Sequence, residues 1–458
     1  MSEKNIVVVS NRGPVSYEWG SKGELINKRG AGGLVSALGP LLKGTGTMWI
    51  AAAITEADRA AAKQGMVDLE DFSLRVLNID PKDYAMAYDV IANETLWFLH
   101  HGLFDLSRRP RFDINWQKAW QGYERVNKIF ADAIVQEAPK NSIILVQDYH
   151  LALVGKYLKK IRNDMKIVHF SHTPFCSAQE LAILPNQIGK LLIEAMSDYD
   201  ACGFHSKRWE NNFIACCKEI EQKVPDTFIS PLGPDFESLK EIASTNACRD
   251  QKENLLQQVG KRQLLVRVDR MEPSKNLLRG LWAFDEMLAL YPEFREKVIF
   301  FQIAYPSREE LPEYISYKTE AESLTKFIND KWSTPTWQPV ILNMSGNFSL
   351  SIAALCSYDA LLVNPVRDGL NLVAKEGPLL NQRNGLLILS NQAGAFDELQ
   401  EQVQPINPFD ISQTAHAIAH ALKADPNYKD LQISKLKELC LQNNPTTWLE
   451  KQLQAAQD

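Results

Sequence analysis

Two cations follow a predicted strand in the second half of the chain. Arg270 and Lys275 belong to the segment 268–276, which directly follows an apolar run. Guanidinium and ammonium groups fixed at a strand end suit a diphosphate, because they donate charge-assisted hydrogen bonds to phosphate oxygens. The segment therefore predicts a phosphate site, although a surface loop with two ordinary charges fits the same residues equally well.

A second candidate segment, residues 364–376, combines a glycine turn with the beginning of a predicted helix. We expect the helix to begin at about residues 370–372, where exposed N–H groups can hold phosphate oxygens. Asp368 lies at the turn and can accept hydrogen bonds from sugar hydroxyls, or can cap the helix instead. Glu376 can accept from ribose hydroxyls. The candidate positions are Asp368, Gly369, Leu370, Asn371, Leu372, Val373 and Glu376.

The first half of the chain also has candidate residues after predicted strands. Arg12 follows the run Ile6–Ser10, and Gly33 lies in a glycine cluster before a helix, where backbone N–H groups can approach an anion. A tight turn explains that cluster equally well, and the absence of G-x-G-x-x-G disfavours a dinucleotide site. Asp148 and His172 follow adjacent strands and can face one substrate, although a single histidine is more often structural.

The sequence predicts no metal site. Asp198-Tyr199-Asp200 matches the D-x-D pattern of metal-dependent transferases, but it joins a predicted helix to a strand, which favours capping. His416 and His420 share a predicted helix without the glutamate of an H-E-x-x-H zinc motif. The seven cysteines are odd in number and form no C-x-x-C pair, which is typical of reduced thiols in a cytoplasmic protein.

Composition excludes several classes of partner. The 458 residues are 45% apolar and 23% charged, as in soluble proteins of two or more domains. The net charge of −6 disfavours nucleic acid and anionic membranes as partners. The apolar runs are shorter than the about 18 residues of a membrane helix, and the first is too short for a signal peptide. We expect a cytoplasmic protein that acts on small molecules.

Predicted strands and helices alternate along the chain. Apolar runs at 6–10, 142–147, 166–171, 201–204, 264–268, 298–303, 340–342, 360–363 and 385–389 predict strands, and segments 116–136, 151–161, 277–290 and 414–422 predict helices. This alternation predicts two Rossmann-like domains with parallel sheets, which bind ligands at the carboxyl ends of their strands. We expect one domain over 1–236 and another over 237–440, with a helix at about 441–458 packing back on the first.

Together these motifs resemble the trehalose-6-phosphate synthase family of retaining glycosyltransferases. The resemblance covers nearly the whole chain, and the motifs keep the order of the family. The matching segments are Val9-Ser10-Asn11-Arg12, Gly32-Gly33-Leu34, Asp148-Tyr149-His150, His172-Thr173-Pro174-Phe175, Ser274-Lys275 and residues 367–376. The resemblance implies the GT-B fold, an α/β fold in which two doubly wound, Rossmann-like domains face each other across a cleft.

The resemblance implies a role for each candidate residue. The expected catalytic residues are His172, Asp148, Arg270, Lys275 and Asp368. In the acceptor site, Arg12 and Arg308 would bind a phosphate, and Tyr88, Trp97 and Asp148 would line the pocket. In the donor site, Gly33 would approach the phosphates, Arg270 and Lys275 would hold the diphosphate, and His172, Asp368 and Glu376 would contact the transferred sugar or the ribose.

The resemblance further implies transfer of glucose from UDP- or GDP-glucose to glucose 6-phosphate, giving α,α-trehalose 6-phosphate with retention at the anomeric carbon. The leaving diphosphate would itself accept the acceptor's proton, so neither a metal nor another cofactor is expected. The expected partners are the nucleotide-sugar and the sugar phosphate, and a homo-oligomer is compatible with the sequence.

Several positions depart from the family pattern. Ala51-Ala52-Ala53-Ile54 replaces the Gly-Trp-Ser-Gly of many members, and Asn276 stands where many have glycine. These changes resemble a subgroup that includes pseudo-glycosyltransferases making validoxylamine phosphate. Another phosphorylated acceptor, such as glycerol 3-phosphate or a cyclitol phosphate, is therefore an alternative, as is a catalytically silent sugar-phosphate sensor.

Overall fold

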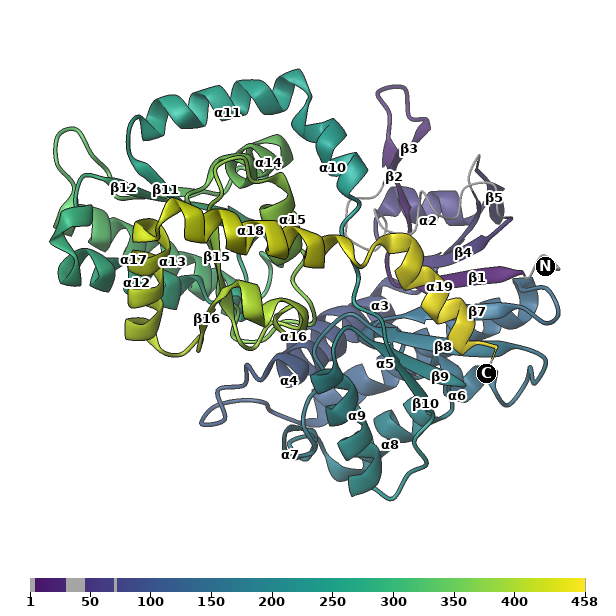
Figure 1. Ribbon diagram of the computed structural model, residues 1–458. Coiled ribbons are helices and arrows are strands. Elements are labelled where there is room, and N and C mark those ends of the chain that lie inside the picture. Colours follow the sequence, from purple (N-terminus) through teal and green to yellow (C-terminus); the bar gives the residue numbers. More distant parts are fainter. Residues whose placement is uncertain (1–4, 30–45, 70–71, 458) are drawn as a thin grey trace. The chain divides into compact units, whose positions relative to one another are not determined.

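The computed structural model describes residues 5–29, 46–69 and 72–457, which form two compact units (Figure 1). One unit comprises Met1–Pro231 and Pro445–Asp458, and the other comprises Leu232–Asn444. The division falls at Pro231, whereas the sequence places it at residue 236. Each unit contains a parallel sheet with helices, so the predicted α/β class is confirmed.

In the described part of the first unit, the main sheet has the order β10-β9-β8-β7-β1-β4-β6-β5. Its strands are β1 (Ile6–Ser10), β4 (Met48–Ala52), β5 (Met66–Asp68), β6 (Ser73–Leu77), β7 (Ile143–Gln147), β8 (Lys166–Ser171), β9 (Ala201–Phe204) and β10 (Asp226–Ile229). Only β5 pairs antiparallel in this sheet. Strand β1 pairs with both β4 and β7, so the order of strands reverses direction there. Such a switch point is where doubly wound sheets bind ligands.

Helices and a hairpin complete the described first unit. The hairpin joins β2 (Val15–Trp19) to β3 (Leu25–Arg29). The helices are α2 (Glu56–Ala62), α3 (Pro81–Ala85), the π-helix η2 (Met86–Leu96), α4 (Trp97–His101), α5 (Ile114–Glu137), the 3₁₀ turn η3 (Tyr149–Leu151), α6 (Val154–Leu158), α7 (Ala178–Leu181), α8 (Asn186–Ser197), α9 (Lys207–Glu219) and α19 (Pro445–Ala455).

The predicted helix over residues 151–161 is wrong in extent, because α6 covers only Val154–Leu158. In the residues between β7 and α6, hydrogen bonds to side chains of α5 take the place of helical hydrogen bonds. Tyr123 Oη donates to the Tyr149 carbonyl oxygen at 2.5 Å, and Asn127 Oδ1 accepts from the Leu153 amide at 3.0 Å. The chain after β7 therefore forms η3 and a turn before α6 begins.

The second unit contains a sheet with the order β13-β12-β11-β14-β15-β16 among the described residues. Its strands, all parallel, are β11 (Gln263–Arg270), β12 (Val298–Tyr305), β13 (Val340–Asn343), β14 (Ala360–Val363), β15 (Leu386–Ser390) and β16 (Gln404–Ile406). In chain order this is 3-2-1-4-5-6, the Rossmann order, with its switch point between β11 and β14. Nearly every residue of β14 and β15 is buried and apolar, as expected for strands covered on both faces.

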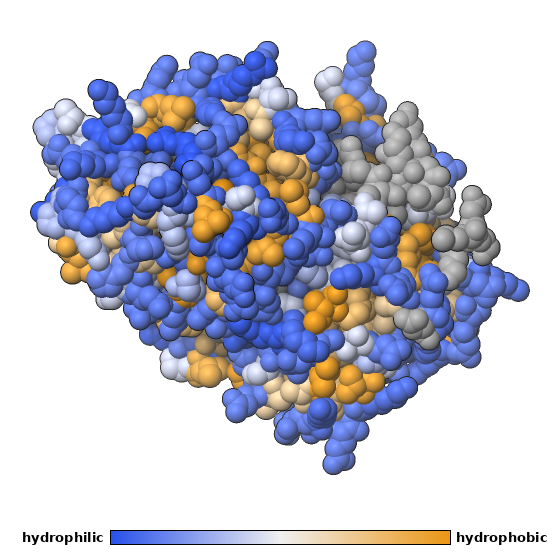
Figure 2. All heavy atoms as spheres, in the orientation of Figure 1, coloured by the Kyte–Doolittle hydropathy of each residue, from blue (hydrophilic) through white to orange (hydrophobic). Residues whose placement is uncertain are grey.

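The helices of the second unit include the long α12 (Leu277–Leu290), whose predicted bounds are confirmed. The others are α10 (Phe236–Ala243), α11 (Asn246–Val259), η4 (Pro273–Lys275), η5 (Pro292–Phe294), α13 (Pro312–Trp332), α14 (Phe348–Ser357), α15 (Val373–Leu380), α16 (Phe396–Leu399), η6 (Gln400–Gln402), α17 (Ile411–Lys423) and α18 (Pro426–Leu441). Figure 2 shows mostly hydrophilic residues on the visible face, with apolar residues in small groups. None of the helices in the described chain has the length and apolar content to span a bilayer.

Helix α19 belongs to the first unit although it lies at the end of the chain. Trp448 is fully buried, with its ring 5.1 Å from that of Phe170 on β8. Gln452 Oε1 accepts a hydrogen bond at 3.2 Å from Gln147 Nε2, at the end of β7. The helix therefore packs beside the strand ends that carry Asp148 and His172.

We predict that Trp448→Ala lowers the free energy of unfolding of the first unit by about 3–5 kcal/mol, because it removes a buried indole. Hydrogen exchange of the β8 amides in urea would measure this. Lys451→Ala, at an exposed position of the same helix, is the control and should change stability by less than about 0.5 kcal/mol. Equal effects of the two substitutions would contradict the packing of α19 against β8.

Candidate active site

Arg12 follows β1 and contacts an aromatic group in the first unit. Its Nη2 donates to Tyr88 Oη at 3.1 Å, and its guanidinium lies 5.9 Å from the centre of the Tyr88 ring. Tyr84 stacks on Tyr88 at 5.5 Å and donates from its hydroxyl to Asn11 Oδ1 at 3.2 Å. The first turns of η2 thus bring a tyrosine to the strand end that carries Arg12. Such π segments are frequent at functional sites.

A row of aromatic rings connects Tyr88 with the end of β7. His150 stacks on Tyr88 at 5.7 Å and on Tyr149 at 4.1 Å. Trp97, the first residue of α4, lies 6.1 Å from Tyr149. The structure therefore brings together Arg12, Tyr88 and Trp97 with the segment that follows β7. His150 and Tyr84 were not predicted as site residues from the sequence, although His150 stands within the motif Asp148-Tyr149-His150.

Asp148 lies in a strained backbone conformation at the end of β7. Its φ of 70° is in the region that non-glycine residues rarely adopt, and such strain is concentrated at functional sites. Its Oδ1 accepts from the His172 amide at 3.1 Å, and its carbonyl oxygen lies 3.2 Å from His169 Nε2. Asp148 therefore joins the end of β7 to the end of β8, where His172 lies.

His172 is held by a side-chain amide. Its Nε2 lies 3.0 Å from Gln147 Oε1, an acceptor, which assigns the ring proton to Nε2. The Gln147 amide is oriented in turn by Gln452. Burial, together with the nearby His169, lowers the pKa of His172 to about 3, so the ring is neutral near pH 7. A neutral imidazole with a fixed tautomer can donate or accept a hydrogen bond but carries no charge.

Buried ion pairs surround the end of β11 in the second unit. Arg267 is fully buried, and its Nε donates to Asp269 Oδ2 at 3.0 Å. Lys275 Nζ donates to Asp368 Oδ2 at 2.5 Å. Burial lowers the pKa of Lys275, but the carboxylates of Asp368 and Asp269 outweigh burial and raise it above its ordinary value. Lys275 is therefore an ammonium group held beside the strand end.

Asn276 explains one departure from the family pattern. Its φ is 61°, a left-handed conformation that glycine adopts freely and that asparagine tolerates best among other residues. Its Nδ2 donates to the carbonyl oxygens of Asn364 and Pro408 at 2.9 and 2.8 Å. The asparagine thus preserves the turn that many members make with glycine, and it ties β11 to the end of β14.

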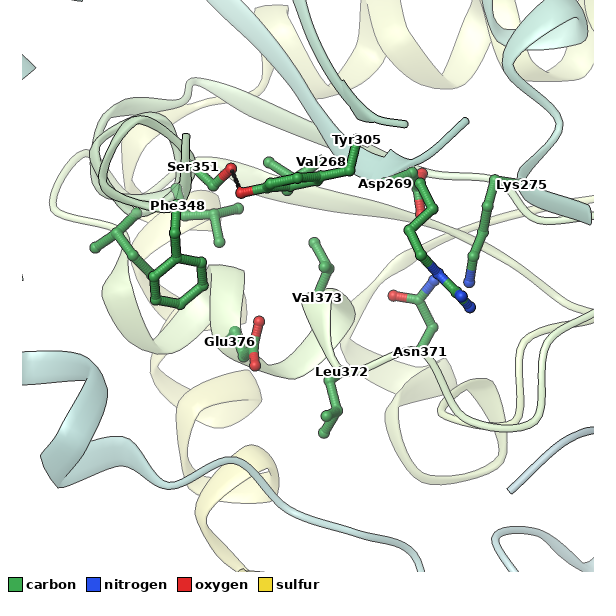
Figure 3. Close-up of a pocket in the computed structure, with 13 residues that line it drawn as sticks. Val268, Asp269, Lys275, Tyr305, Phe348, Ser351, Asn371, Leu372, Val373 and Glu376 are labelled. Carbon is green, nitrogen blue, oxygen red and sulfur yellow. Dashed lines mark hydrogen bonds between the residues drawn. The ribbon is translucent and has the colours of Figure 1, made fainter. Parts of the chain in front are cut away.

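A cavity of about 230 Å³ opens at the carboxyl end of β11 (Figure 3). In Figure 3 Lys275 and Asn371 lie on one side of it, Phe348 lies on the other, and the Glu376 carboxylate faces the space between them. Its lining residues are Val268, Asp269, Arg270, Lys275, Tyr305, Phe348, Ser351, Ile352, Leu355, Asn371, Leu372, Val373 and Glu376. Burial raises the pKa of Glu376 to about 7. The cavity thus combines two cations with an acidic group and an apolar wall.

The segment 364–376 differs locally from the prediction. Helix α15 begins at Val373 with Leu372 as its N-cap, one residue beyond the range of about 370–372 expected from the sequence. Asn371 has a left-handed φ of 79°, which interrupts the helix before that point. Its side chain supports the helix start, because Oδ1 accepts from the Ala374 amide at 3.3 Å, and its Nδ2 donates to Asp368 Oδ2 at 3.1 Å. Leu370 is buried, and neither it nor Gly369 is among the residues that line the cavity.

Two cations of the second unit share one carboxylate. Arg270 Nη1 lies 2.9 Å from Glu272 Oε1, and Arg308 Nη1 lies 3.7 Å from the same oxygen. Arg308 also donates to Tyr314 Oη. Glu272 was not predicted as a site residue, because nothing in the sequence of this charged segment indicates that the glutamate is buried. Gly33 lies outside the described residues.

The two motifs that resemble metal sites in the sequence, Asp198-Tyr199-Asp200 and the pair His416 and His420, make structural contacts. Asp200 Oδ1 lies 2.5 Å from Lys159 Nζ, and its Oδ2 accepts from the Ile167 amide at 2.8 Å. Asp198 caps the end of α8. His416 Nδ1 lies 2.6 Å from Tyr291 Oη. In the described ranges, no group of three histidine, cysteine or acidic side chains is placed to hold a metal ion.

Two doubly wound units with cations and carboxylates at their strand ends match the GT-B class of glycosyltransferases. The chain belongs to glycosyltransferase family 20, whose model matches residues 4–458. A UDP-forming α,α-trehalose-phosphate synthase of Aspergillus fumigatus is 30% identical over 98% of this chain and 89% of that protein. A trehalose-6-phosphate synthase of Mycobacterium marinum is 29% identical over 100% and 94% of the two chains.

Solved structures agree with this family. An E. coli trehalose-6-phosphate structure with bound UDP-2-fluoro glucose has a TM-score of 0.87 and 26% identity, over 99% of both chains. A UDP-forming α,α-trehalose-phosphate synthase of Burkholderia xenovorans in complex with glucose-6-phosphate has a TM-score of 0.86 and 25% identity, over 99% of this chain and 100% of that chain. The family and fold expected from the sequence motifs are therefore confirmed.

We predict that the His172 imidazole stays neutral from pH 8 to pH 5, because burial depresses its pKa. An unfolded histidine titrates near pH 6.5. Protonation therefore favours the unfolded state, and this residue's contribution to stability is lost as the pH falls below about 6.5. Nitrogen-15 NMR of labelled histidine, with His172→Asn to assign the signal, measures the charge state. A His172 signal that titrates between pH 5 and pH 8 would contradict the half-buried, Gln147-bound geometry.

Proposed function

We propose that this chain is a retaining glucosyltransferase that makes α,α-trehalose 6-phosphate from UDP- or GDP-glucose and glucose 6-phosphate. The observation that carries the proposal is the cavity at the end of β11, where Arg270, Lys275 and Glu376 line one space. Cations suit a diphosphate, and a carboxylate accepts from ribose hydroxyls. The named substrates of the two solved relatives, a UDP-sugar analogue and glucose-6-phosphate, support the same assignment.

In the donor site, Arg270 and Lys275 would hold the diphosphate and Asp368 would accept from the transferred glucose. Asp368 is already fixed by Lys275 and Asn371, so it is oriented before a sugar arrives. The amides at the beginning of α15, near Leu372 and Val373, would add donors to the phosphates. Gly33 is the further donor contact that the family resemblance implies.

In the first unit, Arg12 would bind the phosphate of the acceptor, and Tyr88, Trp97 and Asp148 would line its sugar pocket. Arg308, in the second unit, is the further phosphate ligand of the acceptor that the family resemblance implies. We assign the acceptor mainly to the first unit and the nucleotide-sugar to the second.

The chemistry would require no protein nucleophile. The bond between the anomeric carbon and the diphosphate breaks, while a hydroxyl of the acceptor attacks the same face of the sugar. The hydroxyl proton moves to an oxygen of the leaving diphosphate. Arg270 and Lys275 would stabilise the charge that grows on that diphosphate, and neutral His172 would contact the donor sugar near the reacting carbon.

A different phosphorylated acceptor is the second candidate function. The segment Ala51-Ala52-Ala53-Ile54 supports it, because these small side chains replace an indole near the expected acceptor pocket. Ala51, Ala52 and Ala53 are buried at and just beyond the end of β4. Such a change alters the shape of an acceptor pocket without touching the donor cavity.

Product identification tests the proposal directly. The purified protein would be incubated with UDP-glucose or GDP-glucose and with glucose 6-phosphate, glycerol 3-phosphate or a cyclitol phosphate, and NMR would identify the product. We expect α,α-trehalose 6-phosphate from glucose 6-phosphate. Turnover only with another acceptor would favour the second candidate function, and no turnover with any pair would favour a sensor.

We predict that turnover persists in excess EDTA, because Arg270 and Lys275 would take the place of a metal at the diphosphate. Initial rates would be compared before and after dialysis against the chelator. A complete loss of rate that added magnesium or manganese restores would contradict this assignment.

We predict that Arg270→Ala and Arg308→Ala affect different kinetic constants. A charge-assisted hydrogen bond contributes about 1.5–3 kcal/mol, so each loss should be about 10- to 150-fold. Arg270→Ala should lower kcat with every acceptor, because charge grows on the diphosphate during reaction. Arg308→Ala should mainly raise the KM for glucose 6-phosphate and narrow the preference for glucose 6-phosphate over glucose. Weakened donor binding with an unchanged phosphate preference in Arg308→Ala would contradict the placement of the acceptor.

A further inference from the structure

Glu272 lies between two cations that the proposed function gives to different substrates. Its side chain is fully buried just beyond the end of β11. Oε1 lies 2.9 Å from Arg270 Nη1 and 3.7 Å from Arg308 Nη1. Ser307 Oγ donates to the same oxygen at 2.7 Å. One carboxylate oxygen therefore contacts groups that follow two different strands.

Those two strands fix the positions from which the cations extend. Strands β11 and β12 pair in parallel, with Arg270 opposite Tyr305, and the Met271 amide donates to the Tyr305 carbonyl oxygen at 2.7 Å. Arg308 has a left-handed φ of 46° and a side chain that is only 12% exposed. Tyr314 Oη accepts from its guanidinium. A guanidinium confined in this way has few other orientations, and its charge requires a close counter-ion.

Glu272 carries that counter-charge. Burial raises its pKa, but the charges of Arg270, Arg308 and Lys275 outweigh burial and hold the pKa below its ordinary value. Its second oxygen, Oε2, has no hydrogen-bond partner among the described residues. A buried carboxylate with one unsatisfied oxygen is a poor means of stabilising a fold. Its contacts instead indicate a role in placing the two guanidinium groups.

We propose that Glu272 is a positioning residue that sets the separation between the cation for the donor diphosphate, Arg270, and the cation for the acceptor phosphate, Arg308. The inference rests on the proposed function, which assigns these cations to different substrates. Removing the charge of Glu272 would strengthen the attraction of each cation for phosphate, whereas losing the fixed geometry would weaken each site. These two effects oppose each other when one substrate binds alone, so the Kd of each substrate should change little. Transfer needs both phosphates placed at once, and a misplacement of about 1 Å can cost about 100-fold in rate.

Glu272→Gln tests the proposal, because it keeps the size of the side chain and removes its charge. We expect kcat for glucose transfer to fall by about 30- to 100-fold. Calorimetry would measure the Kd of glucose 6-phosphate alone and the Kd of the nucleoside diphosphate alone. The nucleoside diphosphate is UDP or GDP, according to the sugar donor used. We expect each Kd to change by less than about threefold. The control is Glu309→Gln, in the loop after β12, which removes a half-exposed carboxylate that pairs with Lys318 of α13 and should leave kcat within about twofold.

Glu272→Asp separates the effect of charge from the effect of side-chain length, because it keeps the carboxylate on a side chain shorter by one methylene. Its kcat should lie between those of the wild type and Glu272→Gln, and a full wild-type rate would overturn the proposal. An unchanged kcat in Glu272→Gln would also overturn it. The proposal would also be overturned if kcat and the stoichiometry of nucleoside diphosphate binding fell by the same factor. Such a result would mean that the substitution only reduces the amount of folded protein, which is the effect of a merely structural role. A wild-type protein that transfers no glucose to glucose 6-phosphate would instead contradict the proposed function itself.

Discussion

The pairing of cations with buried carboxylates at the end of β11 is the constraint on which the candidate site depends. Arg267 pairs with Asp269, Lys275 with Asp368, and Arg270 and Arg308 with Glu272. A charge removed from water must have a partner, and a partner of fixed position also fixes the direction of the charge. Lys275 and Arg308, which are largely buried, are therefore oriented before any phosphate binds, whereas Arg270 is half exposed and contacts the same carboxylate as Arg308. Cations fixed in advance can stabilise a leaving group electrostatically without reorganisation.

The sheet topology makes this pairing possible. Strand β11 lies between β12 and β14, so residues that follow three strands meet at one edge. Two backbone features then bring the chains close together. A Cβ at Gly280 would lie 2.7 Å from Arg267 Nη1, so a larger residue there would require the buried guanidinium under α12 to shift. Asn276 adopts its left-handed conformation beside the same guanidinium and accepts from it at the carbonyl oxygen. The charge network and the turn thus depend on each other.

Much of this architecture could be predicted from the sequence, because parallel strands are apolar over nearly their whole length. Strand β14 and helix α12 occur at their predicted bounds. The position of Arg270 and Lys275 at a strand end also follows from the pattern. Local geometry that depends on tertiary contacts could not be predicted in this way. Helix α6 is short because Tyr123 and Asn127 hold the preceding turn, and α15 begins late because Asn371 is left-handed. The burial of Glu272 likewise follows from the pairing of two strands, which no single segment encodes.

In the proposed reaction, separate cations of the second unit receive the diphosphate and the phosphate of the acceptor. A crystal structure with a nucleoside diphosphate and glucose 6-phosphate bound together would test it most directly. We expect Arg270 and Lys275 to contact oxygens of the diphosphate, Arg308 to contact the phosphate of the sugar, and Glu272 to remain between the two arginines. A diphosphate bound by Arg308, or a sugar phosphate bound away from it, would contradict this assignment.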